Sequence, residues 1–421
     1  MTDRTAPSPL TNPWFALFAL LLVSIFNYAD RYLVSGLIGP LKQAFGVGDG
    51  FIGLLMGPAF VVLYVFAGIP IARLADRNSR IRIIAIGCIL WSAATVATGL
   101  AQTAWQIALA RVFVGIGEAA FAAPAYSLVA DFFRPERRGI AFSILGMATY
   151  IGQIGGQGVG PLIAQAHDWR MAFFALGCIG LALGLLLPLV VRDPPRGSGA
   201  KPGVTIPFGE LLTKLRTAPS FMLMAVAFGL GSLSGVSFGV WGPELFARAH
   251  GIDPVTAKTT FATYFGLAGL LGMLGFGAII DRLSRRSMAW PLTLGAFALA
   301  AATACIIAAT WVPSFAVAKA LAIPSGLLGG GWSIGFLATL SYILPDRFRA
   351  SATALFLAVT TLLGFFIGPW AAGQISQSLG NDAQSLRLGL SVTIPIGFIA
   401  ALLAWQAIRR FEADRERLAQ A

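Results

Sequence analysis

The sequence predicts an all-α integral membrane protein with twelve transmembrane helices in two pseudo-symmetric halves of six. Of its 421 residues, 57% are hydrophobic and only 11% are charged, and the mean hydropathy of +0.78 lies outside the range of soluble domains. Apolar stretches of about 20 residues, long enough to cross a hydrocarbon core about 30 Å thick, occur twelve times. A short charged pattern also occurs twice, with its aspartates Asp76 and Asp281 lying 205 residues apart, which indicates a duplicated unit.

The expected spans form two sets of six with one long interruption between them. They are residues 14–37, 51–72, 81–101, 105–130, 139–165, 171–191, 219–246, 258–280, 288–310, 312–344, 349–378 and 386–408. The interruption is rich in proline and glycine near its start and carries five cations, as expected of a linker at the membrane surface. The expected division is therefore an N-terminal half (1–191), a cytoplasmic linker (192–218) and a C-terminal half (219–421).

The basic residues are distributed unevenly between the two sets of loops. The chain ends and the even-numbered loops hold 22 of the 30 Lys and Arg, the odd-numbered loops hold five, and three lie within spans. Because loops rich in Lys and Arg stay in the cytoplasm, this bias predicts a multi-pass plasma (inner) membrane protein with both termini cytoplasmic. The topology thus explains the net charge of +12, and we expect no nucleic-acid partner.

Span five has glycines at four-residue spacing that end in a Gly-Pro pair, and span eleven has a similar set of glycines with a Gly-Pro pair. A face of small residues lets a neighbouring helix pack closely, and the proline weakens the local backbone hydrogen bonds so that the helix can bend. The pattern is compatible with tight packing and with a hinge. The residues are Gly152, Gly156, Gly160 and Pro161 in the first half, and Gly364, Gly368, Pro369 and Gly373 in the second.

Four ionisable residues lie deep in the predicted spans of the first half. Asp30 and Arg31 are adjacent in span one, while Arg111 and Glu118 lie seven residues apart, on one face of span four. An ionisable side chain at such depth costs roughly 2.5–3.5 kcal/mol, so it usually faces a cavity or a partner. Permanent salt bridges between the two helices are one interpretation. We favour a functional one, because a carboxylate whose affinity for a proton changes as the site opens is what proton coupling requires.

The second half has few deep charges but offers polar and aromatic side chains that could line a cavity. An apolar, aromatic wall of this kind suits an amphipathic substrate better than a sugar acid. Taken singly, each of these residues is explained equally well by helix packing. The cavity candidates, including two from span one, are Asn27, Tyr28, Trp241, Tyr264, Trp332 and Ser333.

The duplicated charged pattern resembles the loop signature of the major facilitator superfamily, Gly-x-x-x-Asp-Arg-x-x-Arg-Arg. Residues 277–286 match it fully, whereas in the first copy Ala72 replaces the glycine and Ile81 the last arginine. With the twelve spans, this resemblance covers essentially the whole chain and implies that superfamily's fold. It also implies a cytoplasmic gate formed by these loops and neighbouring helix ends. The matching residues are Asp76, Arg77, Arg80, Asp281, Arg282, Arg285 and Arg286, with Asp131 as a partner.

Within that superfamily, the chain is most similar to bacterial members of the Spinster group. The supporting stretches are residues 27–31, 115–120, 130–138, 191–197 and 349–357. The resemblance implies transport of lysolipids or sphingosine-type phospholipids, with proton coupling through the acids at positions 30 and 118. Organic-anion symporters carry related motifs, so symport of small organic anions is the alternative.

These observations together predict a secondary active transporter that works by alternating access and is driven by protons. Asp30 and Glu118 would carry the proton, and Arg31 and Arg111 would adjust them or meet an anionic headgroup. The expected partners are the membrane, protons and a lipid-like or organic-anion substrate. We expect a monomer, with no metal and no cofactor.

An enzyme and a channel are both disfavoured. Lipid chemistry needs a nucleophile with a base, or a metal cluster. The chain has only two histidines and three cysteines, and they show no metal-ligand or redox spacing. A channel would be expected to show rings of like charge or a repeated carbonyl filter, and the sequence shows neither.

Overall fold

The computed structural model describes residues 12–194, 208–345 and 349–420, and all regular structure in these ranges is helical. Eleven helical stretches are long and apolar enough to cross a membrane, and each coincides with one of the twelve expected spans. The remaining span, residues 139–165, is also helical, but a turn at Met147 divides it and it contains the buried glutamines Gln153 and Gln157. The expected all-α membrane fold is therefore confirmed.

The chain divides into two compact units. Unit 1 comprises residues 1–37 and 59–201, and unit 2 comprises residues 38–58 and 202–421. The main boundary falls inside the expected linker, of which residues 195–207 lie outside the described part of the chain. Residues 38–58 come from the first half of the sequence, yet they group with unit 2.

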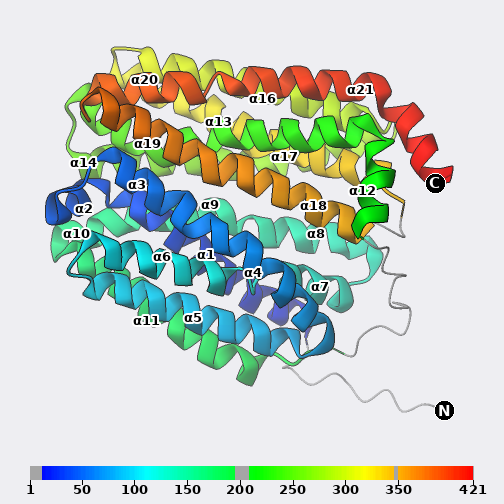
Figure 1. Ribbon diagram of the computed structural model, residues 1–421, viewed down its shortest axis with the longest axis horizontal. Helices are drawn as coiled ribbons and strands as arrows, with labels where there is room; N and C mark the ends of the chain where they lie inside the picture. The colour runs from blue at the N-terminus through cyan, green and yellow to red at the C-terminus, as the bar shows by residue number, and fades with distance from the viewer. Residues whose placement is uncertain (1–11, 195–207, 346–348, 421) are drawn as a thin grey trace. The chain divides into compact units, whose positions relative to one another are not determined.

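Unit 1 is a helical bundle with its bounds close to the expected spans (Figure 1). Its helices are α1 (Pro13–Gly36), α4 (Pro58–Arg77), α5 (Arg80–Leu100), α6 (Ala104–Glu118), α7 (Ala122–Phe132), α8 (Pro135–Gly146), α9 (Ala148–Gln153), the π-helical turn η2 (Ile154–Val159), α10 (Gly160–Ala166) and α11 (Trp169–Val190).

Unit 2 is a second bundle, and in Figure 1 α16 and α21 run side by side along one of its edges. Its helices are α2 (Ile38–Phe45), α3 (Asp49–Met56), α12 (Phe208–Arg216), α13 (Pro219–His250), α14 (Pro254–Phe261), η3 (Ala262–Gly266), α15 (Leu267–Ser284), α16 (Trp290–Trp311), α17 (Phe315–Ile343), α18 (Arg349–Thr361), η4 (Leu362–Ile367), α19 (Gly368–Leu379), α20 (Ala383–Thr393) and α21 (Ile396–Gln420).

Local sequence explains where several helices begin and end. The side chain of Asn12 accepts a hydrogen bond from the backbone N–H of Trp14, and Pro13 occupies the first position of α1, where a missing N–H costs nothing. Thr103 and Gln106 form a capping box at the start of α6. Gly251 ends α13 in the left-handed conformation, which glycine adopts without steric cost.

The two glycine-rich spans have the same local distortion. In each, a π-helical turn directly precedes the Gly-Pro pair, η2 before Gly160-Pro161 and η4 before Gly368-Pro369. Proline lacks an N–H and its ring clashes with the carbonyl four residues earlier, so a wider turn relieves the strain. The two units thus repeat a structural irregularity as well as a sequence pattern.

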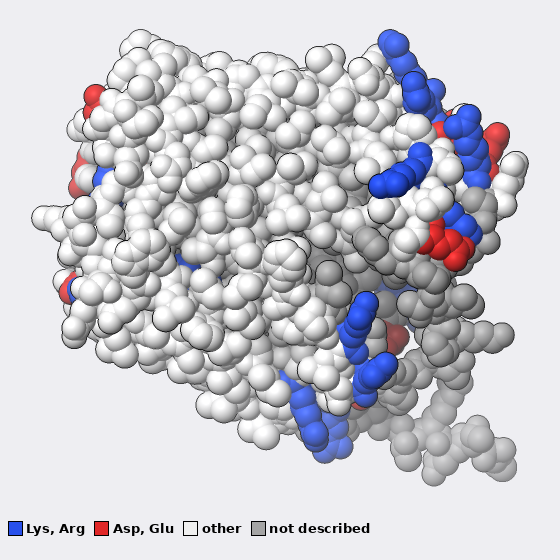
Figure 2. Space-filling view, viewed as in Figure 1, with Lys and Arg blue, Asp and Glu red and all other residues white. Residues whose placement is uncertain are grey.

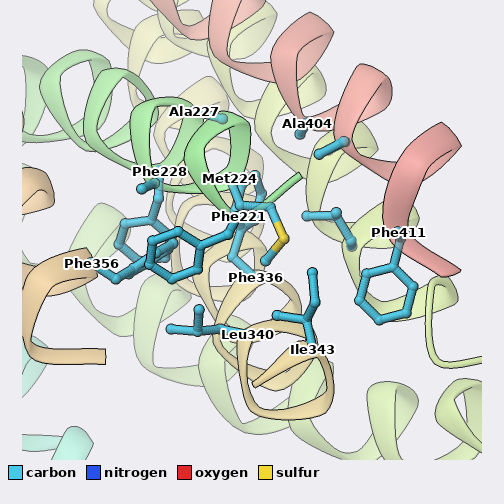
Figure 3. Close-up of a cluster of buried hydrophobic side chains, with 14 of the residues drawn as sticks. Phe221, Met224, Ala227, Phe228, Phe336, Leu340, Ile343, Phe356, Ala404 and Phe411 are labelled. Carbon is cyan, nitrogen blue, oxygen red and sulfur yellow. The ribbon is translucent and has the colours of Figure 1, made fainter. Parts of the chain in front are cut away.

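An aromatic core holds unit 2 together (Figure 3). Phe221 and Phe228 of α13 point toward Phe336 of α17 and Phe356 of α18. The Phe228 ring centroid lies 4.8 Å from that of Trp332 and 5.3 Å from that of Phe356, distances at which aromatic pairs attract one another.

Candidate functional site

The four deep charges of the first half form two ion pairs inside unit 1. Arg111 Nη1 lies 2.6 Å from Asp30 Oδ2, and Arg31 Nε lies 2.5 Å from Glu118 Oε2. Each acid is therefore paired with an arginine from the other helix. Asp30, Arg111 and Glu118 are at most 2% exposed, so the pairs are almost completely removed from solvent.

A hydroxyl group and three aromatic rings complete this site. Thr95 of α5 donates its hydroxyl proton to Asp30 Oδ1 over 2.7 Å. The guanidinium carbon of Arg31 lies 4.8–5.1 Å from the ring centroids of Tyr28, Phe60 and Tyr64. Rings at this distance stabilise a cation through the negative potential of their faces.

Three buried polar atoms of the site have no hydrogen-bond partner in the described structure: Asn27 Nδ2, Arg111 Nε and Glu118 Oε1. Asn27 shares a face of α1 with Asp30 and Arg31, because residues three and four positions apart are neighbours on a helix. An unsatisfied buried polar atom costs about 1–3 kcal/mol. The site therefore has two donors and one acceptor available for a proton, a water molecule or a polar substrate group.

The sequence predicted that these four charges can pair with each other, but it did not predict which acid meets which arginine. It also missed Thr95, Phe60 and Tyr64. The signal for Thr95 is weak, since threonine often bonds its own helix backbone, as Thr95 also does with the Trp91 carbonyl.

A second cluster of unit 1 is centred on Arg80, at the start of α5. Its guanidinium group lies 2.5 Å from an Asp131 carboxylate oxygen, 3.0 Å from one of Asp193 and 2.9 Å from the Ser127 hydroxyl. These contacts tie the first turn of α5 to the end of α7 and to the segment after α11. Arg77 is exposed, and the side chain of Asp76 lies outside the described part of the structure.

The second copy of the charged pattern lies at the end of α15. Arg282, Arg285 and Arg286 are all exposed there, and the side chain of Asp281 lies outside the described part of the structure.

The aromatic candidates of the second half lie in different environments. Trp241 is fully buried and donates its indole N–H to the Pro369 carbonyl over 2.9 Å, while Trp332 belongs to the aromatic core. Both side chains are thus packed inside unit 2. Tyr264 is 37% exposed, with Lys319 Nζ 5.3 Å from its ring centroid, and Ser333 is half-buried.

Sequence reasoning missed a charge network in unit 2 that is centred on Asp49, at the start of α3. Arg248 of α13 makes two hydrogen bonds to its carboxylate, of 2.7 and 2.8 Å. Lys42 donates a third over 2.7 Å and the Ser376 hydroxyl of α19 a fourth over 2.6 Å. The carboxylate is fully buried, with cations from α2 and α13 and a hydroxyl donor from α19 around it.

The network continues through Glu244, which accepts a hydrogen bond from Arg248 over 2.9 Å and lies 3.4 Å from the nearly buried Lys258. Lys42, Arg248 and Lys258 are three of the five cations that the sequence placed in odd-numbered loops. Their position was a signal that the sequence offered. Cations are rare on the less basic side of a membrane protein, so those present there are expected to have a specific partner.

Comparison with known proteins assigns the chain to a family. The model of the Major Facilitator Superfamily matches residues 20–362. An MFS-type efflux pump of Mycolicibacterium smegmatis is 29% identical over 98% of this chain and 96% of its own length. Protein spinster homolog 1 of Mus musculus is 30% identical over 94% of this chain and 81% of its own. Sphingosine-1-phosphate transporter SPNS2 of Danio rerio is 29% identical, over 91% and 81% respectively.

The fold agrees with these relatives. The crystal structure of a bacterial homolog to the human lysosomal transporter Spinster, in an inward-facing and unoccupied conformation, superposes with a TM-score of 0.84 at 24% sequence identity. The superposition covers 97% of this chain and 99% of the other. The chain therefore belongs to the Major Facilitator Superfamily of membrane transporters, in its Spinster-like group.

Proposed function

We propose that this transporter is a proton-coupled secondary active transporter that works by alternating access and carries an amphiphilic, lipid-like molecule of the lysophospholipid or sphingosine-phosphate type. The observation that carries the proposal is the buried site of unit 1, in which two acids are paired with two arginines and Glu118 keeps one oxygen without a partner.

The pairing suggests how a proton would be exchanged for substrate. Protonation of Glu118 removes the negative charge that holds Arg31, and the freed guanidinium group can then bind an anionic headgroup. Loss of the headgroup restores the ion pair and releases the proton. The membrane potential contributes about 2.3 kcal/mol per charge and 100 mV, enough for roughly 50-fold accumulation per proton.

The support for a lipid-like cargo is chemical and comparative. A phosphate or a carboxylate matches the planar guanidinium groups of Arg31 and Arg111, and the rings around Arg31 offer an apolar surface to the adjoining part of an amphiphile. The name of the zebrafish relative, a sphingosine-1-phosphate transporter, points to the same class.

Transport in reconstituted vesicles tests the coupling. We expect an imposed pH gradient to drive movement of a fluorescent lysophospholipid by the wild-type protein, and Asp30→Asn and Glu118→Gln to abolish the gradient-driven component. Asp168→Asn, at a half-exposed carboxylate, is the matched control. Full gradient-driven transport by both site variants would refute proton coupling through this site.

Symport of small organic anions is the alternative, and the free Nε of Arg111 favours it, because a second bond from this guanidinium could complete a carboxylate clamp. Competition separates the two cargoes. The lipid proposal expects lysophospholipids to displace bound fluorescent substrate and hexuronates to fail. The reverse order would support the organic-anion symporter.

We further infer a plasma (inner) membrane protein that is active as a monomer, with both termini and the basic loops in the cytoplasm. Both units come from one chain, so no second copy is needed to form two halves. In this topology the Arg80 cluster belongs to a cytoplasmic gate. Reporter fusions at the C-terminus and within residues 42–48 test the topology, since only the first should report a cytoplasmic location. The gate residues would be Asp76, Arg77, Arg80, Asp131, Asp281, Arg282, Arg285 and Arg286.

A further inference from the structure

An apolar groove of about 690 Å³ runs along the surface of unit 2. It lies between the end of α15, α16 and α21. A cavity of about 10–15 Å³ already holds one water molecule, so this groove has room for a whole hydrocarbon chain. Its wall includes Trp290, Phe297, Ala300, Phe398, Leu402 and Trp405.

The wall of the groove is suited to hydrocarbon and not to water. The lining side chains are aliphatic or aromatic except for Thr293, whose hydroxyl is already donated to the Ala289 carbonyl over 3.2 Å. Phe297 is 71% and Leu402 64% exposed, so both project beyond the small alanines Ala300 and Ala401. Large exposed side chains beside alanines form a groove on a surface that faces the membrane. In a bilayer, the acyl chain of a lipid can fill such a groove.

One end of the groove is bordered by exposed arginines. Arg409 follows Trp405 by four positions and Leu402 by seven, so it continues the stripe of α21 that lines the groove. Arg286 follows the lining residue Leu283 by three positions at the end of α15. Figure 2 shows Lys and Arg side chains where α21 approaches the C-terminus, next to a broad uncharged surface of unit 2.

The remaining features of this end match the headgroup region of a bilayer. Trp290 and Trp405, each about half-exposed, lie in the wall on the side of the arginines, and tryptophan is enriched where the hydrocarbon core meets the headgroups. Basic pockets beside transmembrane helices bind anionic headgroups, and a guanidinium group matches a phosphate with two parallel hydrogen bonds.

We propose that this groove is a binding site for an anionic phospholipid of the surrounding membrane. One acyl chain lies along Phe297, Leu402 and Trp405, and the phosphate group binds Arg409 with Arg286 beside it. The lipid is a bound component of unit 2 and not the transported cargo. The inference rests on the groove and its charges and is independent of the proposed transport cycle.

Native mass spectrometry of the purified full-length protein tests the site. The probes are phosphatidylglycerol and phosphatidylcholine with identical chains, added at equal concentration. We expect the wild-type protein to retain phosphatidylglycerol preferentially. One cation near the membrane surface is worth about fivefold in affinity, so Arg409→Gln should reduce that preference by about this factor. Arg415→Gln, at a half-exposed cation six residues further along α21 that is paired with Glu412, should leave the preference unchanged.

A second pair of variants tests the groove itself. Ala401→Phe fills it and should lower retention of both lipids, whereas Ala182→Phe, at an exposed alanine of α11, should not. Trp405→Ala removes part of the groove wall without adding bulk and should also lower lipid retention. It replaces Ala401→Phe in the test if that variant fails to fold. Thermal unfolding of each variant controls for folding.

Three outcomes would overturn the proposal: equal retention of the two lipids by the wild-type protein, an unchanged preference in Arg409→Gln, or unchanged retention in the groove variants. Displacement of the lipid by stoichiometric lysophospholipid would assign the groove to cargo, and a dimeric mass without bound lipid would assign it to a second copy. Either result would also contradict the proposal.

Discussion

At the scale of single residues, the two buried acids of unit 1 are held differently. Asp30 has both oxygens occupied, one by Arg111 and the other by the Thr95 hydroxyl. One oxygen of Glu118 accepts a hydrogen bond from Arg31, and the other has no hydrogen-bond partner among the described residues. Glu118 therefore has an oxygen at which a proton meets no existing hydrogen bond, whereas each oxygen of Asp30 already accepts one. This asymmetry leads us to expect unequal consequences when each acid is replaced.

Asp30→Asn should destabilise the protein more than Glu118→Gln. The first change leaves Arg111 only 2% exposed and without a carboxylate, which costs about 3–5 kcal/mol in a buried pair. The second leaves Arg31 facing three aromatic rings, each worth about 0.5–2 kcal/mol to a cation. The measurement is the midpoint of thermal unfolding of the purified variants in one detergent.

The control for this comparison is the double variant Asp30→Asn with Arg111→Gln. Removing both charges leaves no uncompensated ion, so we expect it to recover part of the stability lost in Asp30→Asn. Equal losses for the two acids, or no recovery in the double variant, would show that the pairs do not determine the stability of this region.

At the scale of secondary-structure elements, the charged site depends on how closely α1 and α9 approach. A Cβ atom at Gly152 would lie 2.5 Å from the Tyr28 Cβ and 2.7 Å from the Ile25 carbonyl oxygen. Those neighbours belong to the turn of α1 just before Asp30. The glycine spacing of span five therefore reflects tight packing beside the site, as the sequence predicted.

Gly152→Ala should destabilise the protein and impair transport together. The added methyl group cannot be accommodated without shifting backbone, and overpacking of this kind costs about 1–3 kcal/mol. Gly155→Ala, three residues later, is the matched control, because its Cβ would meet only the Ala29 Cβ at an ordinary 3.6 Å. Thermal unfolding and vesicle transport of both variants measure the effect. If Gly155→Ala were as damaging as Gly152→Ala, close packing would not be the cause.

A second element, α3, is fixed by the Asp49 network. Asp49→Asn would leave Arg248 and Lys42 partly uncompensated around a fully buried position, so we expect α3 to detach locally. Hydrogen exchange of the amides in residues 38–58 should then become faster, with little change in unit 1. Glu412→Gln, at an exposed ion pair of α21, serves as the control. Unchanged exchange would mean that apolar packing alone holds the element.

At the scale of the whole molecule, much of the architecture was predictable because membranes impose simple rules. Apolar length predicted eleven of the spans closely, but it missed the turns that interrupt several of them, at Gly57, at residues 119–121 and at Met147. Depth along a helix predicted that Asp30, Arg31, Arg111 and Glu118 need partners. The spacing of residues along one helix does not specify how a neighbouring helix is rotated about its axis. The sequence therefore could not predict that Asp30 pairs with Arg111 and Glu118 with Arg31.

The contacts that sequence reasoning missed join residues far apart in the chain. Asp49 meets Arg248 across 199 positions and Ser376 across 327. Trp241 and Trp332 were cavity candidates because aromatic residues beside serine and glycine suit both a binding wall and a packed core. A single sequence does not distinguish these two environments; in the structure both side chains are buried.

The assignment of residues 38–58 to unit 2 has a consequence for the whole chain. Besides the Asp49 network, α3 approaches α19 so closely that a Cβ at Gly53 would lie 2.8 Å from the Pro369 carbonyl oxygen. Residues 38–58, which precede the linker in the sequence, are thus attached to the rest of unit 2 by non-covalent contacts. We expect a protein cleaved at a protease site inserted within residues 195–207 to keep its two fragments together during purification in mild detergent.

The decisive comparison is a cleaved protein that also carries Asp49→Asn and Gly53→Leu. The first change removes the central charge of the network, and the second places bulk against the α19 backbone, so the non-covalent attachment of α3 should be lost. Size-exclusion chromatography should then show separated fragments, while the cleaved parent elutes as one species. Adding Glu412→Gln to the cleaved parent should leave it intact. Fragments that stay together in the double variant would show that contacts other than those of α3 join them.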